Sequence, residues 1–160
     1  MGLDGYVACD CIEKGIARVP AAIAGLVKID KDSGSNYLDS LDKRFRQVYS
    51  QWRASKPCPH DGFMLMSRRL GSAAGIAGFR KILAAGLNDP TMDVRILWSK
   101  VLYSGVHSGD SLSVKEVARL QADLQVAQPL AKEDAVFRRF LKHLGDLVDA
   151  SLRMGKPLGF

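Results

Sequence analysis

The chain has 160 residues, of which 47% are apolar and 25% are charged. This length and composition are those of one globular domain with a buried core, so we expect a single domain over residues 1–160. The formal net charge of +6 suits an acidic partner, but the basic residues are scattered, with pairs such as Arg68 and Arg69 and no run of five. That scatter argues against nucleic-acid binding.

The cysteine count and the hydropathy pattern bear on the cellular compartment. Three cysteines are an odd number, which argues against a framework of disulfides. The first residues lack the basic and apolar stretches of a signal peptide, and no apolar run reaches the length of a membrane span. We therefore expect a cytoplasmic protein that does not associate with a membrane.

The N-terminal part of the chain predicts extended structure and turns. Residues 5–12 predict a strand, a turn at 13–15 returns the chain along 16–19, and a second extended piece follows at 26–29. Residues 30–36 are polar and contain glycine, which is typical of a solvated loop.

Two short motifs hold all three cysteines and one of the three histidines. Cys9 and Cys11 lie in the predicted first strand, where side chains two residues apart point to the same face. Cys58 and His60 have the same spacing. Three thiols and an imidazole are one of the sets that close a tetrahedral zinc site, so we expect these four residues to bind zinc.

The first clear helix is expected at residues 40–53. Its apolar stripe begins at Leu41 and ends at Trp52. The helix must end before Pro57, since a residue that precedes proline avoids the α region. Pro57 and Pro59 then hold Cys58 and His60 extended, which lowers the entropic cost of binding a ligand. The alternative is a stiff loop with a half-buried cysteine.

The middle of the chain predicts a strand at 62–70 and a helix at 72–85, with Ser72 as N-cap and Gly86 just after the helix. Residues 94–103 have apolar residues at helical spacing but a composition that favours a strand. We favour a buried strand there.

A polar, glycine-containing loop follows, and it holds His107 and Asp110. A histidine and an aspartate three residues apart are candidates for acid–base catalysis or for orienting a metal ligand. The alternative is a turn in which Asp110 caps the next helix.

The last third of the chain predicts helices at 113–127 and 131–154. The first opens with a capping box, Ser113 with Glu116, and Gly155 ends the second. Residues 156–160 then add a short edge strand. The fold class predicted for the whole chain is α+β, mainly helical, with a small and mostly antiparallel sheet.

A thiol nucleophile is a second interpretation of the cysteines. One thiol would pair with His60 or His107 and be oriented by Asp61 or Asp110. No oxyanion-hole or nucleophile-elbow motif accompanies these residues.

Several motifs together resemble a family of small uncharacterised bacterial proteins. They are the opening Gly2-Leu3-Asp4-Gly5-Tyr6-Val7 before Cys9-Asp10-Cys11, Cys58 with His60, Arg69-Leu70-Gly71, and Lys100-Val101-Leu102-Tyr103-Ser104-Gly105 before His107 and Gly109-Asp110. The chain departs from that family at Ser72, where the family has Asn, and at Ser108, where it often has Cys. The second departure argues against a ligand role for the loop. Proteins of this kind resemble immunity proteins, which bind and block a toxin.

These observations together predict a cytoplasmic bacterial binding protein with a structural zinc site, most concretely an immunity protein. Its basic charge favours an acidic or non-nuclease toxin as the protein partner, because an inhibitor of a nuclease would itself be acidic. The alternative is a zinc- or thiol-dependent hydrolase that uses His107 and Asp110.

Overall fold

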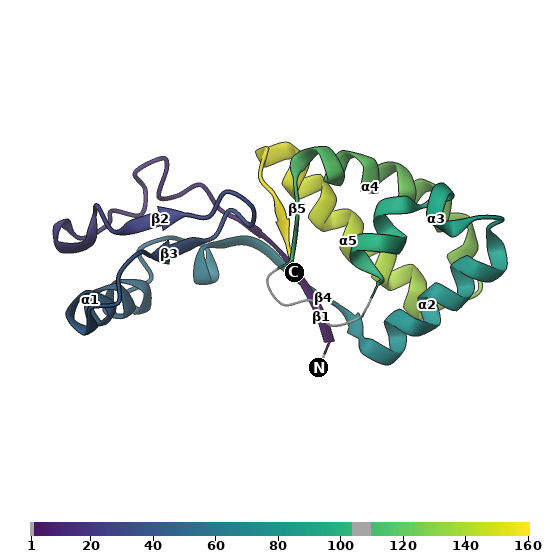
Figure 1. The fold of residues 1–160 in the computed structure, drawn as a ribbon, viewed down its shortest axis with the longest axis horizontal. Helices are drawn as coiled ribbons and strands as arrows, with labels where there is room; N and C mark the ends of the chain where they lie inside the picture. Colours follow the sequence, from purple (N-terminus) through teal and green to yellow (C-terminus); the bar gives the residue numbers. More distant parts are fainter. Residues whose placement is uncertain (1, 104–109) are drawn as a thin grey trace.

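The computed structural model describes residues 2–103 and 110–160 (Figure 1). Two long antiparallel strands, β1 (Gly2–Ala8) and β4 (Met64–Ser72), run side by side through the middle of the molecule. Helices α2 (Ala73–Gly86), α3 (Pro90–Asp93), α4 (Val114–Ala127) and α5 (Ala135–Met154) lie at one end, and we call this part the helical lobe. Residues 9–63 project from the other end, and we call them the arm.

The arm contains β2 (Val27–Ile29), β3 (Asn36–Leu38) and α1 (Lys43–Ala54), with short 3₁₀ turns at Ala21–Ile23 and Asp61–Phe63. Helix α1 begins later than predicted, because the Asp42 side chain accepts a hydrogen bond from the Arg44 amide, 2.8 Å away, and caps the helix. Leu41 therefore lies outside the helix and is 85% exposed, so its place in the predicted stripe was wrong. The predicted return strand at residues 16–19 is absent, because residues 16–17 form a bend and residues 18–19 have no regular structure.

The main sheet has four antiparallel strands in the order β4-β1-β6-β5, and β2 and β3 form a separate antiparallel pair. Strands β5 (Ser111–Leu112) and β6 (Leu158–Gly159) are short. The C-terminal strand was predicted to lie at an edge, but β6 lies between β1 and β5. It fits there because Gly159 faces Tyr6, and a Cβ at position 159 would overlap the tyrosine ring.

Capping fixes the three long helices close to their predicted bounds. Ser72 caps α2, and Ser113 and Glu116 form the predicted capping box of α4. Helix α5 begins at residue 135, not 131, because residues 128–131 form a 3₁₀ turn and Asp134 accepts hydrogen bonds from two amides of the first turn. Gly155 ends it in the left-handed conformation, with φ of 62°.

The strand predicted at residues 94–103 is wrong, because Leu97–Val101 forms a π-helical turn. The carboxylate of Asp123 accepts hydrogen bonds from the Ile96 and Leu97 amides at 2.7 and 2.9 Å, which satisfies the start of the turn. The Arg80 guanidinium donates to the carbonyls of Trp98 and Leu102 at 3.0 and 3.2 Å and satisfies its end. These distant side chains decide the conformation, which explains why composition misled the prediction.

The described residues contain two buried apolar clusters. The larger fills the helical lobe and includes Phe79, Phe137 and Phe140, whose rings contact one another. The smaller lies in the arm and consists of Cys9, Cys11, Ala17, Trp52, Cys58 and Phe63. Leu65 packs against both.

The α+β class and the dominance of helix are confirmed. The single domain stays a prediction. No helix in the described part of the chain combines the length and the apolarity needed to cross a bilayer.

Candidate metal centre

Cys9 and Cys11 lie just beyond the end of β1, in the first turn of the arm. The predicted strand over residues 5–12 ends at Ala8, so the two thiols do not share a strand face as we expected. The Cys9 amide donates to the Phe63 carbonyl at 2.9 Å, and the Ala17 amide donates to the Cys11 carbonyl at 2.9 Å. These two hydrogen bonds curl the chain so that both thiols point into the arm.

Cys58 and His60 reach the same point from the segment between α1 and β4. The backbone of His60 is extended, with φ of −92° and ψ of 137°, which agrees with the prediction from the flanking prolines. The His60 amide points at the Cys58 sulfur at 3.3 Å, and this contact folds the Cys58 side chain back toward the imidazole.

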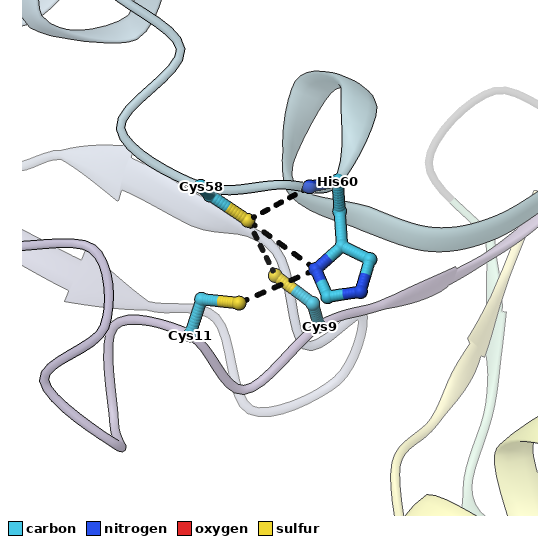
Figure 2. Close-up of side chains that lie close together, drawn as sticks. All are labelled: Cys9, Cys11, Cys58 and His60. Atoms are coloured by element: carbon cyan, nitrogen blue, oxygen red, sulfur yellow. Dashed lines mark hydrogen bonds between the residues drawn. The ribbon is translucent and has the colours of Figure 1, made fainter.

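The four predicted side chains converge (Figure 2). Their ligand atoms all lie within 4.8 Å of one another. The Cys9 and Cys58 sulfurs are 3.5 Å apart, and His60 Nδ1 lies 3.3 Å from the sulfurs of both Cys11 and Cys58. Nitrogen Nδ1, not Nε2, is therefore the imidazole atom directed at the thiols.

These separations fit a tetrahedral metal ion. Zinc–sulfur and zinc–nitrogen bonds of usual length place two tetrahedral thiolates about 3.8 Å apart and a thiolate and an imidazole nitrogen about 3.6 Å apart. The observed contacts of 3.3 to 3.5 Å lie close to those values, and no two of the ligand atoms are more than 4.8 Å apart, so binding needs a contraction of about 1 Å at most. The residues present fit zinc.

Burial favours the protonated form of the Cys9 and Cys11 thiols unless a cation is present. Cys9, Cys11 and Cys58 are 7%, 1% and 6% exposed. Burial raises the pKa of the Cys9 thiol, and burial together with the neighbouring Cys58 and Cys9 thiols raises the pKa of Cys11 to about 12. A bound metal ion would supply the positive charge that three buried thiolates need.

Aromatic side chains belong to the same buried cluster as the thiols. The Trp52 ring lies 5.1 Å from the Phe63 ring and 5.8 Å from the Tyr49 ring, measured between centroids. The Trp52 Nε1 donates to the Arg18 carbonyl at 2.9 Å. The sequence placed Trp52 on the apolar face of a helix but gave no signal that this face covers the cysteines.

The turn that carries Cys9 and Cys11 is also tied to the helical lobe. Lys156, just after α5, pairs with Glu13 in this turn, and Lys14 pairs with Asp10 at 2.6 Å. Both ion pairs are at least partly exposed, so they contribute little to the free energy of folding and serve mainly to orient the turn.

The other candidate residues do not join the centre. His107 lies outside the described residues. Asp110 is exposed and accepts a hydrogen bond from the Tyr103 hydroxyl, and it is not part of the Cys/His cluster. Asp61 is exposed in the 3₁₀ turn that follows His60.

The geometry of the cluster does not favour a nucleophilic thiol. His60 does contact two thiols, but a reactive cysteine needs exposure and a lowered pKa. Cys11 is 1% exposed and its pKa is raised to about 12, the opposite of both requirements. The arrangement suits ligation of a metal ion better than attack on a substrate.

Comparison of the chain with protein-family models, with curated proteins and with solved structures gave no match. The chemistry of the cluster itself therefore carries the functional argument.

Proposed function

We propose that this protein binds one zinc ion through Cys9, Cys11, Cys58 and His60, and that the ion folds the arm into a rigid protein-binding module. The observation that supports this proposal is the convergence of the four ligand atoms to within 4.8 Å from two segments 49 residues apart in sequence. Three thiols and an imidazole favour zinc over magnesium or calcium, which prefer oxygen ligands.

The role of the ion is structural. Four protein ligands complete a tetrahedral shell and leave no position for a water or a substrate. The arm has few other sources of stability, because Ile23, Trp52 and Phe63 are the large side chains that it buries. Metal binding supplies folding free energy in small modules of this kind.

Partner binding is the second half of the proposal, and its most concrete form is an immunity protein of the bacterial cytoplasm. It draws on the resemblance of the motifs at Cys9 and Asp110 and on the net charge of +6. That charge favours an acidic or non-nuclease toxin as the partner. The hydrolase alternative finds no support in the described residues, since Asp110 is not part of the cluster.

Elemental analysis tests the metal site on protein purified without a histidine tag. We expect one zinc per chain in the native protein and a loss of zinc in Cys58→Ser and His60→Asn. His143→Asn is the matched control, because His143 lies on α5 and contacts the Arg69 carbonyl. A native protein that stays free of metal after incubation with zinc would refute the proposal, as would full zinc retention in both ligand variants.

A further inference from the structure

The arm carries a groove between β3 and α1. Residues 36–41 form one wall, and Arg46, Tyr49 and Arg53 of α1 form the other. Its volume is about 470 Å³. Figure 1 shows β3 lying between β2 and α1, at the end of the molecule away from the helical lobe. We call this feature the arm groove.

Positive charge dominates the helical wall of the arm groove. Helix α1 contains two arginines that line it, Arg46 and Arg53, and has no acidic residue among Lys43–Ala54. Arg53 is held in place, since it donates to the Gly62 carbonyl at 3.4 Å and its guanidinium lies 5.7 Å from the Phe63 ring centroid. Asp39 is the only acidic residue in the lining, so the groove favours an anionic occupant.

The rim of the arm groove is apolar. Leu41 is 85% exposed, the highest value among the large apolar side chains described, and Tyr37 is 45% exposed. Both line the groove. An exposed leucine beside guanidinium groups is typical of a protein interface, in which a central apolar contact is surrounded by charge pairs. Nucleic acid would use the arginines but would leave the leucine unused.

The backbone of the arm groove offers a strand edge. Strand β3 pairs with β2 on one side, and in the described part of the chain no strand pairs with its other side. The Tyr49 hydroxyl donates to the Asn36 carbonyl at 3.1 Å, which fixes the distance between β3 and α1. An extended chain segment can lie along residues 36–41 and pair with the backbone groups that α1 does not already engage, since the Asn36 and Ser40 carbonyls accept hydrogen bonds from Tyr49 and Arg46.

We propose that the arm groove binds an extended, acidic segment of a partner protein, with carboxylates against Arg46 and Arg53 and an apolar side chain against Leu41. This inference rests on the proposed function, in which zinc folds the arm into a protein-binding module, and it names the surface and the chemistry of the partner. The two arginines set charge selectivity, and Leu41 sets the register of the segment.

A displayed library of random peptides, panned against the zinc-loaded full chain, tests the inference. Enriched peptides are expected to combine Asp or Glu with a large apolar residue. Arg46→Glu and Leu41→Ser should each weaken their binding about tenfold, because they remove a charge pair and an apolar anchor. Arg119→Glu is the matched control, since Arg119 is exposed on α4 in the helical lobe, and it should leave affinity within about twofold. Bound peptide should also slow hydrogen exchange at residues 36–41.

Three outcomes would overturn the inference. In the first, no peptide is enriched over a control bait that carries both groove substitutions. In the second, the groove substitutions leave the peptide affinities unchanged. In the third, a labelled oligonucleotide binds tightly and acidic peptides cannot displace it. Zinc content is measured on the same preparations. If the protein contains zinc but enriches no acidic peptide, this inference is refuted and the zinc proposal stands. If the protein contains no metal but still binds such peptides, the zinc proposal is refuted and this inference stands.

Discussion

Removal of zinc should unfold the arm and leave the helical lobe folded. The described residues contain 25 buried apolar side chains in the cluster of the helical lobe and six in that of the arm, three of which are the cysteines themselves. Without the ion, the arm keeps Ile23, Trp52 and Phe63 as its large buried side chains. Fully burying one such side chain contributes about 1.5 to 3 kcal/mol, and the sum for three residues stays well below the conformational entropy cost of ordering a segment this long.

The expected signals follow from the lengths of the helices. Helix α1 has 12 residues, against 14, 14 and 20 in α2, α4 and α5, so chelation should remove about a fifth of the helical signal in circular dichroism. Trp98→Phe leaves Trp52 as the only tryptophan, because the chain has two. Emission from Trp52 should shift to the red as the side chain, now 6% exposed, enters water.

The assay is a titration of the zinc-loaded Trp98→Phe variant with a chelator, followed by both signals. Complete loss of helical signal would refute the division into two separately stable parts and support one cooperative domain. Unchanged emission from Trp52 would show that the arm does not need the ion. Zinc added back should restore both signals, which separates unfolding from aggregation.

Three further predictions concern single side chains. Asp123→Ala should lower the free energy of unfolding by about 2 to 4 kcal/mol in urea titrations, because two buried amides lose their acceptor. Glu116→Gln should destabilise the protein at neutral pH only. Hydrogen bonds from Ser113 hold the pKa of Glu116 below 4.5, so its contribution is present above that pH and is lost as the pH falls through the lowered value. The melting temperatures of the native protein and of Glu116→Gln should therefore become equal in acid. Hydrogen peroxide should release zinc and join Cys9 to Cys58, whose sulfurs are 3.5 Å apart, and peptide mass mapping identifies the bond. The two thiolates lose two electrons as the S–S bond forms, and the peroxide takes up these electrons and two protons from the solvent to become two waters.

Local signals in the sequence were reliable where a helix begins with its own cap. Ser72, and Ser113 with Glu116, start α2 and α4 as predicted, because each cap is a contact within a few residues. The stretch at 94–103 failed because its caps, Asp123 and Arg80, lie far away in sequence. No pattern read over a short window contains that information.

The four residues of the candidate site were predicted correctly to converge, but one of the reasons given for it was wrong. Strand periodicity was expected to align Cys9 with Cys11, but a turn tied to the Phe63 carbonyl does so instead. The residue types and their number carried the prediction, since three thiols and an imidazole suit few other arrangements in a chain with three cysteines. The arm groove was not foreseen, because the exposure of Leu41 depends on where Asp42 caps α1.

The position of β6 in the main sheet has a consequence for the order of folding. Strand β5 touches β6 and not β1, so it can join the sheet only after residues 158–159 are in place. The pairing of Tyr6 with Gly159 closes a loop of nearly the whole chain, and the entropy lost on closing a loop grows with its length. Strands β1 and β4 and the long helices can assemble earlier, through contacts nearer in sequence. Closure of the sheet is therefore expected to be a late and slow step of folding.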